Sequence, residues 1–264
     1  MEQVRSPGVA QVVGHVAQLH RYPVKSLGGE RPERVEVDRR GVVGDRLWAV
    51  TDPDGRFGSG KTTRRFRRMA GLLERRAAYD GEVPVVTFPD GRALRGDDGG
   101  IHAALTAYVG RPVTLAREGA VPHVDEGPVH LVTTASLRAG SAAAPLDARR
   151  ARANLVVDTT VLTDALLLSG APEQEAAGFV EDGWVGSRLS VGTAELALTA
   201  PMPRCVMLGM AQDGLPDDRG VLREVLRCHD GDLGLVADVL VPGVIGVGDE
   251  VRLLGSPPAA SRPS

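Results

Sequence analysis

Cysteine and aromatic residues are scarce in this 264-residue chain, and long apolar runs are absent from it. Its two cysteines, Cys205 and Cys228, are too few for a disulfide-stabilised secreted domain and indicate a reducing compartment. Asp238 interrupts the longest apolar stretch, residues 235–247, so the sequence predicts no membrane-spanning segment. The first ten residues lack the apolar core of a signal peptide, and we therefore expect a cytoplasmic protein.

Charge of one sign is not in excess either. The chain has 31 Lys and Arg against 34 Asp and Glu, which gives a formal net charge of −3. Such a balance excludes a general attraction to nucleic acid or anionic membranes, and an aromatic content of 3% leaves few rings to stack on bases. We therefore expect neither nucleic acid nor membrane as a partner.

Glycine and proline, by contrast, are abundant. The 33 glycines and 18 prolines make up about a fifth of the chain. Residues of this kind favour many short elements joined by turns and exclude an all-helical bundle. The length allows one large domain or two smaller ones. We expect a mainly β, barrel-like fold with two β-rich subdomains and a few short helices.

Apolar periodicity and the positions of turn residues predict the individual elements. Strands are expected at 12–19, 35–37, 47–51, 83–88, 129–132, 154–158 and 195–199. Helices are expected at 62–76, at 101–109 and after Asp217 or Asp218, the last ending at 229–231. The end of the chain predicts a hairpin of 235–241 with 244–254, followed by a disordered tail at 256–264.

Residues 55–62 (GRFGSGKT) match the phosphate-binding pattern G-x-x-x-x-G-K-[ST] letter for letter. In a P-loop, Lys61 would reach the β- and γ-phosphates and Thr62 would hold Mg²⁺. The context disagrees, because residues 52–55 (DPDG) form a hairpin-type turn instead of ending a buried parallel strand. A P-loop nucleotide hydrolase is therefore the weakest of three functional hypotheses.

Three other polar runs each have a structural and a functional interpretation. The arginine-rich segment 64–76 is typical of a solvated face, with a local anion site near Lys61 as the second interpretation. The histidines and acidic residues of segment 123–130 lack a standard metal-ligand spacing, so we expect Asp125 to orient the loop and the two histidines to be structural or to line a substrate pocket. Residues 228–230 (CHD) indicate a helix end, because a catalytic triad is built from spatial neighbours.

Five separated segments carry a family resemblance. They are Tyr22-Pro23-Val24-Lys25-Ser26-Leu27, Gly44-Asp45-Arg46-Leu47-Trp48, Arg152-Ala153-Asn154-Leu155-Val156, Met202-Pro203-Arg204-Cys205, and Pro242-Gly243 with Val247-Gly248-Asp249-Glu250-Val251. In order and spacing they resemble the MOSC domain proteins, named for the C-terminal domain of molybdenum cofactor sulfurase, and among these the amidoxime-reducing branch. The resemblance implies an N-terminal β-barrel domain at 11–115 and a MOSC domain at 116–255.

The resemblance implies a molybdenum cofactor, a pterin that carries a phosphate and a dithiolene, with the mono- or dinucleotide form left open. It assigns Cys205 as the catalytic, metal-ligating thiolate. A thiolate is a soft ligand suited to such a metal, and the neighbouring Arg204 adds positive potential. The alternative is a buried apolar cysteine between Met202 and Met207. A family-level association with pyridoxal phosphate also comes with the resemblance.

By the same resemblance, nine residues would bind the cofactor. They are Lys25, Ser26, Arg46, Lys61, Thr134, Ser136, Arg152, Asn154 and Arg204. Cationic side chains suit phosphate and pterin oxygens, and an amide can pair with the donor and acceptor edges of a pterin. Structural alternatives stay open: Lys25 as a surface lysine, Arg46 as the partner of Asp45 or Glu33, and the hydroxyl residues as strand-end caps.

The chain departs from the family pattern in three places. Ala151 and Ala153 stand where the family commonly has Phe and Pro, so the rigidity of the proline is lost. Residues 60–63 (GKTT) replace a polar arginine/glutamine segment, which makes Lys61 a substitute phosphate ligand. A ferredoxin-like cysteine cluster is absent, so electrons are expected from a separate ferredoxin- or flavoprotein-type protein.

The leading hypothesis is a molybdenum-cofactor oxidoreductase that reduces N-hydroxylated small molecules by oxygen-atom transfer to molybdenum. The alternative is a non-redox module that binds molybdopterin or carries sulfur for a partner. The leading hypothesis requires that Cys205 open onto a cavity lined by cations from distant parts of the chain.

Overall fold

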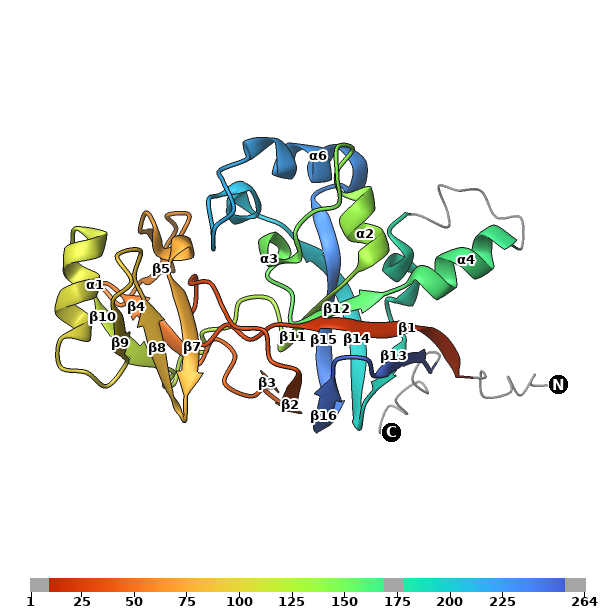
Figure 1. Ribbon diagram of the computed structural model, residues 1–264, viewed down its shortest axis with the longest axis horizontal. Helices are drawn as coiled ribbons and strands as arrows, with labels where there is room; N and C mark the ends of the chain where they lie inside the picture. Colours follow the sequence, from red (N-terminus) through yellow and green to blue (C-terminus); the bar gives the residue numbers. More distant parts are fainter. Residues whose placement is uncertain (1–9, 169–177, 255–264) are drawn as a thin grey trace, which may run out of the picture.

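The computed structural model describes residues 10–168 and 178–254, which form a closed barrel with a smaller lobe beside it (Figure 1). The barrel strands, in order, are β1 (Gln11–Leu19), β12 (Leu155–Asp158), β11 (Val129–Thr133), β15 (Asp232–Val241), β14 (Ala194–Pro203), β13 (Arg188–Val191) and β17 (Glu250–Leu253). The lobe contains the sheets β10 (Thr114–Arg117), β4 (Trp48–Thr51), β5 (Phe57–Ser59), β6 (Phe66–Arg68) and β7 (Arg76–Asp80), β8 (Val83–Thr87), β9 (Ala93–Arg95). A third small sheet, below the barrel in Figure 1, contains β16 (Gly243–Gly246), β2 (Arg34–Asp38) and β3 (Gly41–Val42).

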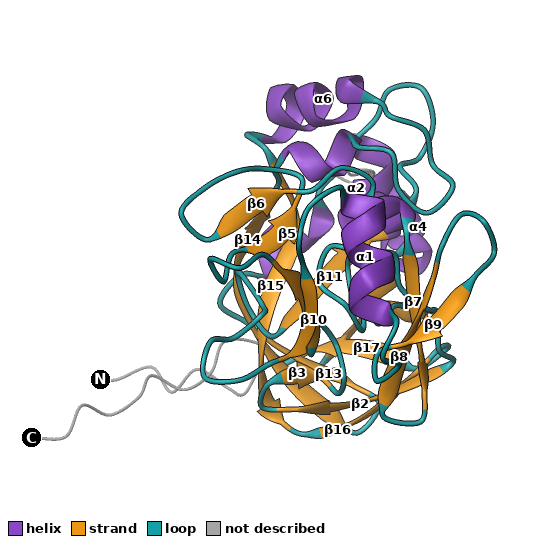
Figure 2. Ribbon diagram, turned by 90° about the vertical axis from the view of Figure 1, so that its left-hand side faces the viewer, coloured by secondary structure: helices purple, strands orange, loops and turns teal. Residues whose placement is uncertain are grey.

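Helices are short and few in the described residues. The α-helices are α1 (Ile101–Val109), α2 (Thr134–Ala139), α3 (Ala148–Ala151), α4 (Thr160–Leu168) and α6 (Arg219–His229). The 3₁₀ turns are η1 (Leu72–Glu74), η2 (Val180–Trp184) and η3 (Val206–Gly209). In Figure 2, α6 lies at one end of the molecule and β2 with β16 at the other. The predicted mainly β, barrel-containing fold class is confirmed.

Strands β11 and β12 pair in parallel in the barrel wall, and both are buried on both faces. Leu131 and Leu155 point into the barrel core, whereas Val132 and Val156 pack in a second cluster that includes residues of the outer helices. Strands covered on both sides are typically apolar runs. β12 is apolar over Leu155–Val157, whereas β11 also contains the buried polar residues His130 and Thr133. Packing against both the barrel core and the outer helices therefore stabilises this part of the barrel wall.

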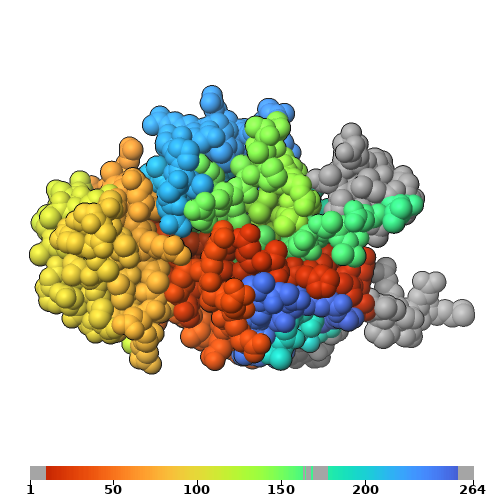
Figure 3. Space-filling view, viewed as in Figure 1, coloured from red at the N-terminus to blue at the C-terminus, as the bar shows by residue number. Residues whose placement is uncertain are grey.

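The first strand joins the two ends of the sequence. β1 pairs antiparallel with both β12 and β17, and its Val13, Val16 and Leu19 are buried in the barrel core. β2 pairs with β16 in the same way. The core of the lobe is formed by residues between Val24 and Leu115 and contains no residue of β1 or β2. These two strands fall within the predicted N-terminal domain (11–115) by sequence, but they pair with strands from the C-terminal half of the chain. Figure 3 shows this N-terminal segment between the lobe and the C-terminal elements.

The local predictions from apolar periodicity are largely confirmed. All seven expected strands are present, with ends displaced by up to four residues. The helix at 101–109 has the predicted bounds. α6 begins after Asp218, whose side chain accepts a hydrogen bond from the Gly220 amide, and it ends at Asp230 in the left-handed conformation. The tail predicted at 256–264 lies outside the described residues.

Two local predictions are wrong. The segment 62–76 is not a helix: it forms β6 and the single turn η1, because Gly71 at φ 77° breaks the helical path that the apolar spacing suggested. The chain end is not a hairpin either, since β16 pairs with β2, and β17 pairs with β1 and β13. Pro242 has no N–H to donate to a ladder beside β15, and long-range pairing prevails.

Among the described residues, no helix is long and apolar enough to cross a membrane.

A glycine on β1 allows the barrel to close. A Cβ at Gly14 would lie 2.0 Å from the carbonyl oxygen of Asp158 on β12, so Gly14→Ala must push the two strands apart. We expect a loss of about 2 kcal/mol in the free energy of unfolding, measured as a lower urea midpoint. Gly99→Ala is the control, because nothing lies within 4 Å of its Cβ position. Equal midpoints for both variants would contradict the β1–β12 pairing.

Candidate functional site

A cavity of about 170 Å³ lies where the lobe meets the barrel. It is lined by residues from six separate parts of the chain: the turn after β1, the loop before β4, the β5–β6 region, the segment that leads into β11, the α3–β12 junction and the end of β14 with the residues after it. Eight of the ten residues predicted for the site line it: Lys25, Ser26, Arg46, Lys61, Arg152, Asn154, Arg204 and Cys205. Cations far apart in the sequence therefore share one cavity with the thiol.

Thr134 and Ser136 do not line this cavity, which corrects their prediction as part of a cofactor-binding hydroxyl cluster. They belong to the start of α2, where hydroxyl groups satisfy free backbone amides. Ser136 Oγ donates to the buried carboxylate of Glu181 at 2.5 Å, and Thr134 Oγ1 donates to Asp158 at 3.2 Å. The N-cap of α2 is Thr133, whose side chain accepts from the Ser136 amide, so the hydroxyls of Thr134 and Ser136 are occupied by carboxylates away from the cavity.

Strained backbone is concentrated at the cavity. Ser26, Arg46 and Arg152 have φ values of 65°, 50° and 53°, and they are three of the five non-glycine residues with positive φ in the described chain. Such conformations cost on the order of 1 kcal/mol or more each and persist where the surroundings enforce them, often at functional sites. The backbone here is therefore shaped to present these side chains.

Of two further arginines of the cavity, Arg152 is buried and Arg204 is half-buried, with an inaccessible Nε atom. Burial lowers the pKa of Arg152 and of Arg204 to about 10, because it disfavours the charged form. Arg204 Nη2 donates to the carbonyl of Ala151 at 2.6 Å. Arg152 Nη2 and Arg204 Nε, however, have no hydrogen-bond partner among the described residues. Buried donors of this kind call for an acceptor, and an anionic ligand would satisfy them.

The ring of Tyr22 contacts two of the arginines. Tyr22 is part of the first segment that carries the family resemblance, but the sequence predicted no role for it. The guanidinium carbons of Arg46 and Arg152 lie 5.0 and 4.3 Å from the centroid of its ring. Arg46 also forms an ion pair with Asp45, the structural partner that the sequence suggested, and donates to the carbonyl of Arg152 at 3.1 Å. Arg46 therefore lines the cavity and also stabilises its wall through the hydrogen bond to the Arg152 backbone.

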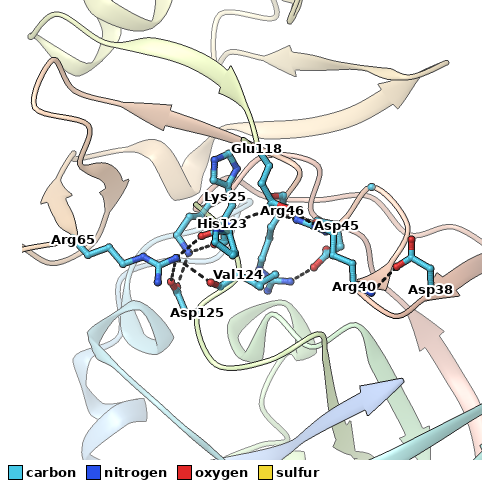
Figure 4. A network of polar contacts seen from close by, with 12 residues as sticks. Lys25, Asp38, Arg40, Asp45, Arg46, Arg65, Glu118, His123, Val124 and Asp125 are labelled. Atoms are coloured by element: carbon cyan, nitrogen blue, oxygen red, sulfur yellow. Dashed lines mark hydrogen bonds and ion pairs between the residues drawn. The ribbon is translucent and has the colours of Figure 1, made fainter. Parts of the chain in front are cut away.

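Lys25 is a buried cation and not a surface lysine. Its Nζ donates to Asp125 Oδ2 at 2.5 Å and to the carbonyl of His123 at 2.6 Å (Figure 4). The rings of Phe57 and Phe66 have their centroids 5.9 and 5.3 Å from the same atom. Burial lowers the pKa of Lys25 to about 8, partly offset by the Asp125 carboxylate.

The segment between the lobe and the barrel forms one wall of the cavity. Arg65 donates to the carbonyl oxygens of Pro122 and Val124 at 2.6 and 3.0 Å, and the amide of His123 donates to Glu118 at 2.7 Å. Glu118 in turn accepts two hydrogen bonds from Arg40 (Figure 4). Arg65, from the arginine-rich run, therefore holds this segment in place by hydrogen bonds. In the described residues, no group of three or more His, Cys, Asp or Glu side chains is arranged to bind a metal ion.

Cys205 is half-buried and follows β14, where it precedes η3. It shares the cavity wall with Met202 and Met207, and Ser59 Oγ lies 3.5 Å from the Met207 sulfur. The alternative of a cysteine enclosed in apolar side chains does not describe this position, because the residue borders a cavity that five lysine and arginine residues also line.

Asn154 and Lys61 border the cavity in different ways. Asn154 is fully buried: its amide accepts from the His130 N–H at 3.1 Å and donates to the carbonyl of His20 at 3.3 Å. These backbone contacts occupy the groups that were expected to read a pterin edge. Lys61 lies over the ring of Phe66, 5.2 Å from its centroid. The β5–β6 loop that carries it leads to a parallel strand and not to a helix, so the P-loop context is absent.

Sequence reasoning missed several other cavity-lining residues. They include Ser59, Phe66, Glu126, Gly127, Ala151, Pro203 and Met207. Most are apolar or small, and no local pattern distinguishes them from ordinary core. The run 228–230 is confirmed as a helix end: Cys228 is exposed, and His229 pairs with Asp182 at 2.6 Å while stacking on Phe179.

The buried ammonium group predicts a particular pH dependence of stability. The folded-state pKa of Lys25, about 8, lies below the ordinary lysine pKa of 10.5, so the unfolded chain binds more protons between these pH values. The free energy of unfolding contributed by this group therefore rises from pH 8 to 10.5, by up to about 3 kcal/mol. We expect the wild type to gain stability over that range relative to Lys25→Met, measured by urea unfolding. A constant difference between the two proteins would show that Lys25 is not desolvated.

Two protein-family models match this chain. Residues 13–97 match the MOSC N-terminal beta barrel domain, and residues 118–252 match the MOSC domain. A search of curated proteins finds no match. Among solved structures, the YUAD protein from Bacillus subtilis is 14% identical with a TM-score of 0.46, over 94% of this chain and 100% of that one. A hypothetical protein is 10% identical with a TM-score of 0.44, over 93% and 70%.

A third solved structure, YiiM from Geobacillus stearothermophilus, is 18% identical with a TM-score of 0.31, over 63% of this chain and 69% of that one. The domain matches decide the assignment, since the MOSC domain alone spans more than half of the sequence. This chain belongs to the MOSC domain family and carries the N-terminal beta barrel domain of that family.

Proposed function

We propose that this protein is an oxidoreductase that holds a molybdenum cofactor in the cavity between lobe and barrel and reduces N-hydroxylated small molecules. One observation carries the proposal. Buried guanidinium groups with unpartnered N–H donors and a half-buried thiol border the same cavity.

The residues of the cavity fit such a cofactor. Its phosphate would satisfy the orphaned donors of Arg152 and Arg204, with Lys25 and Lys61 adding positive charge at the wall. The thiolate of Cys205 is a soft ligand suited to the metal, and a metal keeps a coordinating thiol deprotonated. When bound, the group would supply two-electron redox chemistry.

The protein's own residues would position the reactants and supply protons. Reduction of an N-hydroxyl compound to an amine or amidine and water consumes two electrons and two protons. With a pKa of about 8, Lys25 is protonated at neutral pH, and as a residue that lines the cavity it would serve as a proton donor. Phe66 and Met202 cover part of the wall with apolar surface and so limit water around the substrate.

Replacement of Cys205 tests the proposal. Protein purified from a host that makes the cofactor should contain molybdenum by elemental analysis and reduce benzamidoxime with a viologen reductant. Cys205→Ser should lose at least about 100-fold in activity, because loss of a first ligand changes the metal more than the 10–100-fold typical of outer-shell partners. Its urea midpoint should stay close to that of the wild type, because the side chain is nearly isosteric and borders a cavity.

Cys228→Ser is the matched control, because this second thiol is exposed at the end of α6. Its metal content and activity should equal those of the wild type. Absence of molybdenum from the wild-type protein would refute the proposal outright. Bound pterin without turnover, with any electron donor, would instead favour the non-redox carrier module.

A further inference from the structure

A basic face lies beside the cavity, on the outer side of α6. The helix sequence places Arg219, Arg223 and Arg227 four residues apart, so the three form one stripe. All three are exposed. Leu222 and Leu226 lie within the same arc of the helix, whereas Val221 and Val225 point inward and are buried. The exposed side of α6 thus combines arginines with apolar side chains.

This face extends to the residue next to the thiol. Val206, the residue after Cys205, is 49% exposed, and Leu226 is 51% exposed. A hollow of about 360 Å³ is lined by Val206, Leu222, Arg219 and Asp217 together with Arg68 from the lobe. Figures 1 and 3 show the C-terminal segment with α6 on the same side of the molecule as the β5–β6 region. We call these residues, Arg68, Val206, Arg219, Leu222, Arg223, Leu226 and Arg227, the α6 face.

The charge of the α6 face differs from that of the whole chain, which is −3. Asp217 pairs with Arg219 at 3.4 Å, and Glu224 lies 3.9 Å from Arg227 while accepting from the Ala142 amide. In the described part of the chain, no carboxylate pairs with Arg68 or Arg223. An apolar centre with a cationic rim is the composition of a protein-docking surface, and the excess positive charge selects an acidic partner.

We propose that the α6 face is the docking site of an acidic one-electron carrier protein of the [2Fe–2S] ferredoxin class. The inference rests on the proposed function, which requires two electrons for each N-hydroxyl group reduced. Two reduced carriers, each giving one electron, would dock in turn; as the N–O bond breaks, one proton completes the water released and a second proton is added to the nitrogen. Docking here brings the carrier next to Val206, one residue from Cys205, whereas β2 and β16 lie at the opposite end of the molecule (Figure 2).

Charge reversal on this face provides the test. With an acidic [2Fe–2S] ferredoxin kept reduced by NADPH and its reductase, Arg223→Glu should lower the rate of substrate reduction about tenfold at low salt. The rate of the wild type should fall as salt rises, and the variant should show a weaker salt dependence. With a viologen reductant, which needs no docking, wild type and variant should be equally active. Arg34→Glu on β2, an exposed arginine at the opposite end, is the matched control and should behave as the wild type.

A direct binding measurement separates the two proposals. Fluorescence anisotropy with labelled ferredoxin should give a Kd about tenfold higher for Arg223→Glu than for Arg34→Glu. If viologen drives no reduction but this difference is found, the proposed function fails and the docking site stands. If viologen drives reduction but both variants bind ferredoxin as the wild type does, the docking site is refuted. Loss of binding to an RNA oligomer or to anionic vesicles, with ferredoxin binding intact, would also refute it.

Discussion

The burial of several cations around one cavity is the constraint on which the site depends. Like charges in a region of low dielectric repel one another, and each loses its hydration on burial. The structure offsets this with carboxylates and carbonyl oxygens: Asp45 for Arg46, and Asp125 with the His123 carbonyl for Lys25. The offset is incomplete at Arg152 and Arg204, whose remaining donors have no partner in the described residues. An anion in the cavity would complete a network that the protein leaves unfinished.

The path of the chain keeps these cations in place. β1 is a barrel strand, and the turn directly after it carries Lys25 and Ser26 into the cavity. The lobe then follows, and the segment from Glu118 onward returns along the opposite wall. Because the first strand is hydrogen-bonded into the barrel, the lobe is tied at both of its ends. The site is therefore built between two rigid units, which favours a preorganised cavity.

Much of the fold follows from local pattern, but its pairing does not. Alternating apolar residues located the strands because each buries one face or both. The pairing of β16 with β2 joins residues some 200 positions apart, and no local signal favours it over the adjacent hairpin. The functional site, too, was only partly predictable from the sequence. Its cations followed from motif resemblance, whereas the roles of Tyr22 and Asp125 depend on contacts across roughly 100 residues that only the folded chain reveals.

The apparent P-loop in this sequence has a packing origin. A Cβ at Gly58 would lie 2.4 Å from a methyl carbon of Leu72, and one at Gly60 would lie 2.4 Å from the sulfur of Met210. A side chain at either position would have to displace these atoms, which belong to the lobe core and to the segment after Cys205. Thr62 Oγ1 accepts from the amide of Arg68 and so closes the loop. Of the two glycines in the signature itself, Gly60 is explained by this close contact, whereas Gly55 has open space around it and adopts φ 76° in the turn before β5. Close packing at Gly60 and turn geometry at Gly55 therefore account for the glycine-lysine signature.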